Sequence, residues 1–132
     1  MNLKTTFIFP DDIHTEFQVA AIRHRPKIDK SKLFGLLLEE YLIDKMRGRP
    51  WALQLQNVQF SGKKRAQTFY ISEAIHTEFH IDCTRFHRSM SQVAACIVAR
   101  FLRGESAIAN ATSRQLKDTE RISSNDRYEA RE

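Results

Sequence analysis

Three side chains with metal-binding chemistry fall in one row of a predicted helix. His76, His80 and Cys83 are spaced i, i+4 and i+7, and imidazole and thiolate are the usual ligands of zinc. A similar stretch earlier in the chain has a histidine, a glutamine and an alanine at the matching positions. Cys83 also continues an apolar stripe beside Phe79. The pattern therefore favours a buried cysteine over a metal site, and we expect no bound metal.

The motifs that support catalysis are missing from the sequence. Only four glycines occur, none of them in a phosphate-binding loop, and there is no nucleophile elbow or paired-cysteine motif. Dispersed acids and histidines do not form an active site without geometry. Cys83 and Cys96 both fall in apolar helical patterns, which is typical of buried thiols. We therefore expect a protein that is not an enzyme and uses no cofactor.

The charge pattern favours a polyanionic partner. The net charge is +5, and the stretch from Lys45 to Arg65 contains basic residues and no acid. Nucleic acid is the natural partner for such a surface. The first residues lead into a strand pattern rather than a secretory leader, and no apolar run approaches the roughly 20 residues of a membrane span. We expect a cytoplasmic protein with reduced thiols and no membrane partner.

The chain repeats itself. Residues 13–17 read IHTEF and recur at residues 75–79, an offset of 62. Further along the best offset is 60, which aligns Ser31 with Ser91. The change of two residues falls near residues 25–27, where a loop can absorb it. The sequence therefore contains two copies of one structural unit.

Each copy predicts a short strand followed by a helix. Residues 5–9 and 67–71 are rich in threonine and aromatic residues and are bounded by Pro10 or Ser72, which is typical of strands. Acidic residues follow at once, and they suit the positive end of a helix dipole. The predicted apolar stripes of these first helices consist of Ile13, Phe17 and Ala21 in one copy, and Ile75, Phe79, Cys83 and Phe86 in the other.

A second helix is predicted in each copy, over residues 30–46 and 90–103. Asp29 and Ser89 are the candidates for its N-cap. The helix over residues 30–46 is apolar around much of its circumference, so several neighbours must enclose it. One strand and one short helix are too little cover, and each unit therefore needs a partner.

This order of strand, helix, turn and helix resembles the ribbon-helix-helix family of Arc and MetJ type. The resemblance rests on residues 6–12 (TFIFPDD) and 29–33 (DKSKL), repeated in outline in the second half. It implies two units that pair their strands into an antiparallel ribbon, which enters the major groove of DNA. Having both units in one chain resembles the arrangement of TraY-type conjugation proteins.

The resemblance implies a mainly α fold with a short two-stranded antiparallel β-ribbon, in which the tandem units form an intramolecular pseudo-dimer. We expect unit 1 over residues 1–46, a basic linker over 47–63, unit 2 over 64–103 and a polar, flexible tail over 104–132. In the linker, Trp51 and Leu53 are predicted to cover the core. An extra strand there is the alternative.

Alternation along the strands predicts which side chains face DNA. Phe7, Phe9, Phe69 and Ile71 form the natural inner set. The residues left facing outward, as candidates for base contact, are Lys4, Thr6, Ile8, Lys64, Ala66, Thr68 and Tyr70. This outward set is less polar than the family usually shows. Because it differs between the two copies, we expect an asymmetric DNA site.

The starts of the two second helices are candidates for phosphate contact, since their backbone N–H groups are free to bind an anion. The residues concerned are Lys30, Ser31, Lys32, Arg88, Ser89 and Ser91. Ordinary helix capping explains any one of them equally well. Asp29 would place a carboxylate next to the phosphate.

We therefore expect sequence-specific binding of double-stranded DNA, by a transcriptional repressor or an accessory protein at a plasmid transfer or partition site. The alternative is a protein-interaction module, an antitoxin or assembly adaptor, whose ribbon no longer reads DNA. Self-association on DNA and a protein partner for the tail both stay open.

Overall fold

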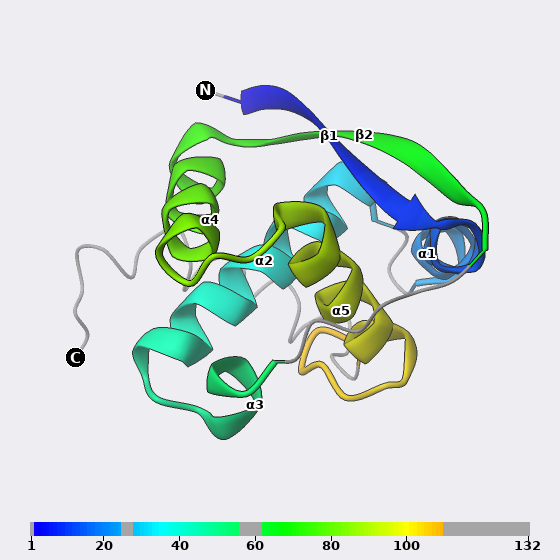
Figure 1. Cartoon of the computed structure of the whole chain (residues 1–132). Coiled ribbons are helices and arrows are strands. Elements are labelled where there is room, and N and C mark those ends of the chain that lie inside the picture. Colours follow the sequence, from blue (N-terminus) through cyan, green and yellow to red (C-terminus); the bar gives the residue numbers. More distant parts are fainter. Residues whose placement is uncertain (1, 25–27, 56–61, 110–132) are drawn as a thin grey trace.

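A computed structural model describes residues 2–24, 28–55 and 62–109. It is mostly helical with one two-stranded antiparallel sheet, as the sequence predicts. Its elements are β1 (Asn2–Pro10), α1 (Asp11–Arg23), α2 (Lys30–Met46), α3 (Pro50–Leu53), β2 (Lys64–Ser72), α4 (Glu73–Arg85) and α5 (Met90–Leu102). Figure 1 shows the two strands crossing one side of the helical body.

The two strands pair along their whole length. Thr6 lies opposite Thr68, and the pairing runs from Asn2 opposite Ser72 to Pro10 opposite Lys64. Both strands are longer than predicted, nine residues each, because cross-strand hydrogen bonds extend beyond the residues with strong strand propensity.

The first helices follow the strands without a loop. The buried residues of α1 include the predicted Ile13, Phe17 and Ala21, and those of α4 include Phe79 and Cys83. The prediction for Phe86 is wrong, since this ring is 51% exposed. Helix α4 ends at Arg85, so Phe86 leaves the helical stripe, and the Lys45 ammonium lies 3.8 Å from its ring centroid.

The second helices begin where their caps predict. The Asp29 carboxylate accepts hydrogen bonds at the start of α2, and the Ser89 hydroxyl does so at the start of α5. Helix α2 packs on β2, α5 packs on β1, and the two helices contact each other. Each second helix therefore covers the strand of the other half, which answers its need for apolar cover.

Aromatic rings fill the space between the ribbon and the helices. The rings of Phe34 on α2 and Phe69 on β2 stack with centroids 4.0 Å apart. Phe7, Phe9 and Phe17 surround this pair at centroid distances of 5.1 to 6.4 Å from Phe34. These residues come from both halves, so the core cannot be divided between them.

The linker covers the core through α3, although not as predicted. Trp51 is partly buried and Ala52 fully buried, whereas Leu53 is 54% exposed. The prediction for Leu53 is therefore wrong, because the short helix turns it outward. Residues 51–55 do not form the alternative extra strand, and the rest of that segment, 56–61, lies outside the described residues.

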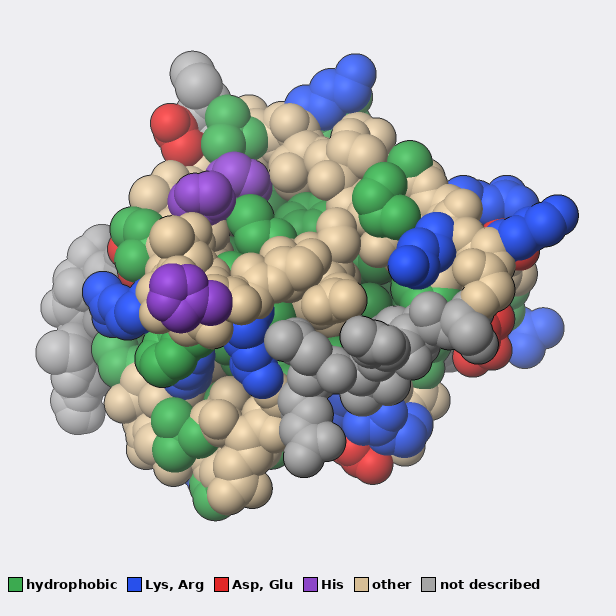
Figure 2. All heavy atoms as spheres, viewed as in Figure 1, with side chains coloured by type: hydrophobic (Ala, Val, Ile, Leu, Met, Phe, Trp, Pro, Cys, Tyr) green, Lys and Arg blue, Asp and Glu red, His purple; other side chains and the backbone are tan. Residues whose placement is uncertain are grey.

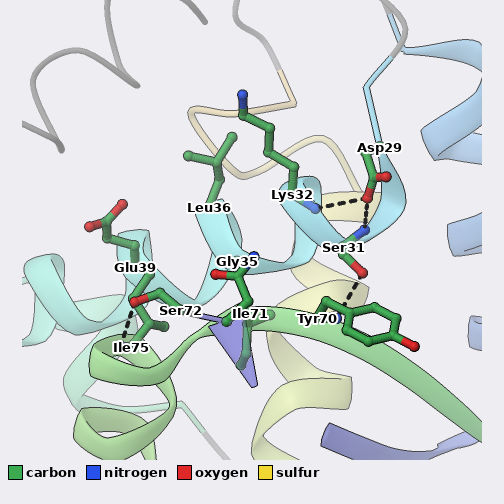
Figure 3. Close-up of a pocket in the computed structure, with 11 residues that line it drawn as sticks. Asp29, Ser31, Lys32, Gly35, Leu36, Glu39, Tyr70, Ile71, Ser72 and Ile75 are labelled. Atoms are coloured by element: carbon green, nitrogen blue, oxygen red, sulfur yellow. Dashed lines mark hydrogen bonds between the residues drawn. The ribbon is translucent and has the colours of Figure 1, made fainter. Parts of the chain in front are cut away.

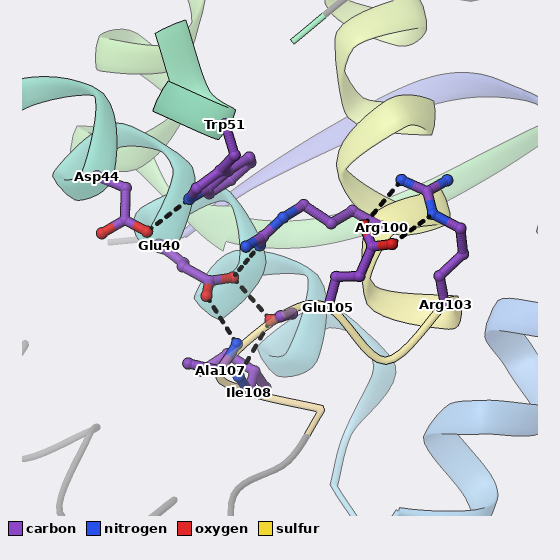
Figure 4. Close-up of polar contacts among 9 residues, drawn as sticks. Glu40, Asp44, Trp51, Arg100, Arg103, Glu105, Ala107 and Ile108 are labelled. Carbon is purple, nitrogen blue, oxygen red and sulfur yellow. Dashed lines mark hydrogen bonds and ion pairs between the residues drawn. The ribbon is translucent and has the colours of Figure 1, made fainter. Parts of the chain in front are cut away.

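The expected tail begins as part of the packed body. Ser106 and Ile108 are buried, and the Glu40 carboxylate accepts hydrogen bonds from the Ser106 hydroxyl and the Ala107 backbone N–H. Figure 4 shows the contact between Glu40 and Ala107. The prediction of a flexible tail is therefore wrong for this first stretch. Residues 110–132 lie outside the described part of the chain.

Both cysteines are buried, as predicted. Burial raises the pKa of the Cys83 thiol to about 11, which disfavours the reactive thiolate. Of the helices in the described ranges, none combines the length and the apolar character that crossing a membrane requires.

Candidate nucleic-acid interface

The outer face of the ribbon carries every residue predicted to face outward. Phe7, Phe9, Phe69 and Ile71 are buried beneath it. On the outer face, the side chains of Lys4, Thr6, Ile8, Lys64, Ala66 and Tyr70 are exposed, and Thr68 is partly exposed. The strand pleat produces this alternation, and the helices cover only one side. The ribbon thus offers one continuous row of side chains to a ligand.

Two threonines form the centre of this row. The hydroxyl oxygens of Thr6 and Thr68 lie 3.1 Å apart and share one hydrogen bond. One hydroxyl proton therefore stays available for a base, and both methyl groups can contact a thymine methyl.

The two ends of the row differ in chemistry. Lys4 lies opposite Tyr70 on one side of the threonines. Ile8 lies opposite Ala66 on the other side, and Lys64, opposite Pro10, follows beyond that pair. The first pair supplies an ammonium and a phenol, whereas the second is entirely apolar. The sequence predicts which residues face outward. It does not predict which of them lie opposite each other, because that depends on the strand register.

Two serines attach the helix starts to the edges of the ribbon. The backbone N–H of Tyr70 donates to the Ser31 hydroxyl, and that of Ile8 donates to the Ser91 hydroxyl, each at 2.9 Å. Figure 3 shows Ser31 reaching from α2 to Tyr70. Sequence reasoning predicted phosphate contact for both serines and missed this positioning role. The signal was the equivalent place of Ser31 and Ser91 in the repeat.

The start of α2 is occupied by a carboxylate. Asp29 accepts hydrogen bonds from the backbone N–H groups of Ser31 at 2.7 Å and Lys32 at 3.3 Å. A pocket beside it is lined by Asp29, Lys32, Glu39 and Tyr70, among others (Figure 3). Two acidic side chains therefore oppose the approach of a phosphate here.

The start of α5 is neutral by contrast. Its cap is the Ser89 hydroxyl, which accepts from the backbone N–H of Gln92. The pocket beside it is lined by Ile8, Pro10, Lys64, Ser89, Ser91, Gln92 and Ala95, with no acid. This start fits a phosphate better than that of α2 does.

The three basic residues predicted to contact phosphate differ in their exposure and in their partners. Lys32 is exposed, while Lys30 is partly buried with its ammonium 5.8 Å from the centroid of the Phe69 ring. Arg88 donates to the backbone carbonyl of Leu55, so its guanidinium is directed at the linker. Of the predicted cations, Lys32 is thus better placed to reach a phosphate than Arg88.

The ribbon itself is free of acids. Neither β1 nor β2 contains Asp or Glu, and they carry Lys4, Lys64 and Arg65. Arg65 pairs with Asp11 at 2.9 Å on the exposed surface. Figure 2 shows Lys and Arg side chains projecting at the upper and right margins, where Figure 1 places the ribbon. The electrostatic character of this face suits a polyanion.

His14 lies buried under this basic region. Burial lowers its pKa, as do the nearby charges of Arg65 and Lys30, whereas Asp11 acts against them. Its Nδ1 has no hydrogen-bond partner. The folded protein therefore resists placing a proton on this ring.

This histidine predicts a loss of stability in mild acid. The unfolded chain takes up the proton near the ordinary pKa of 6.5, before the folded state does. The free energy of unfolding should therefore fall as the pH drops below 6.5. Thermal melts at pH values on both sides of that pKa measure the effect. The variant His14→Gln should lose less stability over this interval, and an unchanged pH dependence would contradict the explanation.

The residues considered for zinc do not converge. Cys83 lies inside the core, whereas His80 is exposed and its Nδ1 lies 3.4 Å from the Met90 sulfur. Within residues 2–24, 28–55 and 62–109, no three His, Cys, Asp or Glu side chains group as a metal site would require.

Comparisons of the chain with protein-family models, with curated proteins and with solved structures found no match.

Proposed function

We propose that the two halves form a tandem ribbon-helix-helix pseudo-dimer. The strand register supports this, since Thr6 lies opposite Thr68, its own counterpart in the repeat. The two serine contacts support it as well: Ser31 bonds the strand of the second half, and its counterpart Ser91 bonds the strand of the first. Such reciprocal contacts are expected of two units related by a pseudo-two-fold axis.

We further propose that this pseudo-dimer binds double-stranded DNA by placing the ribbon in the major groove. The observation that carries the proposal is the outer face of β1 and β2, which is exposed, free of acids and centred on a pair of threonine hydroxyls. The groove is wide enough for two strands. The role that follows is transcriptional repression, or an accessory function at a plasmid transfer or partition site.

A protein-binding ribbon is the second candidate. Ile8 is 45% exposed and Tyr70 is 55% exposed, and such side chains suit a protein interface. In that case the chain is an antitoxin or assembly adaptor. The two candidates differ in their dependence on salt, because phosphate contacts release counterions and protein contacts do not.

Selection of duplexes from a random pool, at two salt concentrations, tests DNA binding directly. We expect enrichment of a defined sequence and weaker binding at the higher salt concentration. The double variant Thr68→Ala and Tyr70→Ala should lose preference for the selected duplex while keeping the fold, with a small fall in melting temperature from the lost Thr6–Thr68 hydrogen bond. If the pool shows no enrichment and no salt-dependent binding, the DNA proposal fails and the protein-binding candidate takes its place.

The two helix starts predict opposite effects of two substitutions. Asp29→Asn keeps an N-cap but removes a negative charge, so affinity for any duplex should rise severalfold at low salt. Ser89→Asp keeps the cap and adds a charge, so affinity should fall by a similar factor. Anisotropy titrations with an unselected duplex measure both. If the affinity changed in the same direction in both variants, or in neither, phosphate contact at these helix starts would be contradicted.

A further inference from the structure

The pair Glu40 and Arg100 holds a special position in the repeat. The two residues are counterparts at the offset of 60, and their charged groups lie 3.7 Å apart. A residue can contact its own counterpart only near the axis that relates two halves. This ion pair, on α2 and α5 (Figure 4), therefore lies near that axis.

Opposite charges at this position favour pairing of a first half with a second half over pairing of two halves of the same kind. A pair of first halves would bring Glu40 against a second Glu40, and a pair of second halves would bring Arg100 against a second Arg100. Only 11% of the Glu40 side chain and 15% of the Arg100 side chain are exposed. Two like charges with so little solvent oppose association strongly.

The contacts around the pair hold it in place. The Arg100 guanidinium lies 3.6 Å from the centroid of a Trp51 ring, and the Trp51 indole N–H donates to Asp44. Glu40 also accepts from Ser106 and Ala107. In a full chain in which one of the two charges is reversed, the other side chain is still held by these contacts and cannot swing into solvent to relieve the repulsion.

A second ion pair between the halves also favours pairing of a first half with a second half. Lys45 on α2 contacts Asp82 on α4 at 2.7 Å, and their side chains are 14% and 15% exposed. Tyr41 donates a further hydrogen bond to Asp82. The counterpart of Lys45 in the second half is Glu105. Two second halves would therefore leave Asp82 without its cation.

We propose that these two ion pairs make the interface between the halves selective for the unlike half. The partner that this surface fits is the other half, in the same chain or in a second copy of the chain, and never a half of its own kind. The inference rests on the pseudo-dimer arrangement proposed above and is independent of DNA binding.

Charge reversal in the full chain tests the selectivity. Glu40→Arg and Arg100→Glu should each lower the melting temperature by about 10 °C or more, because each leaves two like charges buried together. The double variant carrying both changes should regain most of the loss. Its recovery should be incomplete, since an arginine at position 40 cannot accept the hydrogen bonds that Ser106 and Ala107 donate to Glu40 in the parent chain.

Exchange between two chains is the sharper part of the test. When Glu40→Arg and Arg100→Glu chains are unfolded together and refolded, the first half of each finds an opposite charge only in the second half of the other. We expect one-to-one dimers of the two variants, seen by native mass spectrometry, and no such dimers from either variant alone. This holds even if neither variant folds by itself, because the mixture restores both ion pairs.

Two controls separate selectivity from simple loss of packing. Glu40→Gln keeps an acceptor for Ser106 and adds no like charge, so it should cost less than Glu40→Arg. The reversed pair Lys45→Asp with Asp82→Lys should also recover stability relative to its single variants. Single reversals as stable as the parent, or a refolded mixture without two-chain dimers, would overturn the proposal. None of these readouts uses DNA, so their failure leaves the DNA proposal standing.

Discussion

Replacing Lys4 and Tyr70 together with alanine is expected to weaken binding to a selected duplex by about 100-fold. These two side chains lie opposite each other at the polar end of the ribbon. Each good contact between a side chain and a base contributes about 1 to 3 kcal/mol of discrimination. Losing two of them therefore costs about 2 to 6 kcal/mol, and about 100-fold lies in the lower part of that range. Anisotropy titrations with the selected duplex and with an unrelated duplex measure the change.

The opposite end of the ribbon provides the matched control. Ile8 occupies the repeat position of Tyr70 and faces Ala66, so Ile8→Ala removes apolar contact alone. We expect a loss of about tenfold or less, the scale of one weak contact. Both variants should keep the parent's melting temperature, because Lys4, Ile8 and Tyr70 are exposed. Equal losses at the two ends would contradict the assignment of chemistry to the polar end.

This difference between the ends has a consequence for the DNA sequence that is recognised. A homodimer presents the same side chains to both half-sites. In the DNA complex proposed above, Lys4 and Tyr70 would face one half-site, and Ile8 and Ala66, with Lys64 beyond them, would face the other. The selected duplexes should therefore contain one well-defined half-site and one that tolerates substitution. Selection for thymine at the apolar end is consistent with this, since a methyl group is what such side chains can contact.

Local sequence signals were sufficient for the starts of α2 and α5, whereas α3 was not predicted. Asp29 and Ser89 place the starts of α2 and α5 because their side chains satisfy backbone N–H groups that have no partner inside the helix. The strand ends were less predictable. Asn2 and Lys64 have no special strand propensity, and they join the sheet because their partners on the other strand lie beside them.

The failures of prediction have two physical causes, local helix geometry and tertiary contacts. Periodicity predicts Phe86 and Leu53 in the core because it assumes that each apolar side chain continues a regular pattern. Helix α4 ends before Phe86, and α3 turns Leu53 outward. Composition predicts Ser106 and Ile108 in a flexible tail because their neighbours are polar, and contacts with Glu40 on a distant helix bury this stretch. The ends and direction of the helices decided the cases of Phe86 and Leu53, and tertiary contacts decided the third.

The residues of the candidate site could be predicted from the sequence, but their positions relative to one another could not. Alternation along a strand identifies which residues share a face, so the outward set could be read from the sequence. The register, which opposes Lys4 to Tyr70 rather than to another residue, depends on how both halves pack together. The bonds from Ser31 and Ser91 to the opposite strands depend on the same packing.

Phe69→Ala is expected to cause the largest loss of stability. This ring is fully buried, stacks on Phe34 at 4.0 Å, and lies within 6.3 Å of the rings of Phe7, Phe9 and Phe17. Truncating a buried phenylalanine costs about 3 to 5 kcal/mol, from lost burial and the cavity that remains. Unfolding in urea, followed by circular dichroism, measures the change.

Phe86→Ala is the matched control, because it removes the same ring from a position that is 51% exposed. It should cost about 1 kcal/mol or less, mainly through the contact with the Lys45 ammonium. Similar losses from the two variants would contradict this packing. Phe69 joins β2 of one half to α2 of the other, so its loss should loosen the ribbon together with the interface between the halves. Binding to a duplex should therefore weaken in Phe69→Ala even though this side chain is buried beneath the ribbon, and should be unchanged in Phe86→Ala.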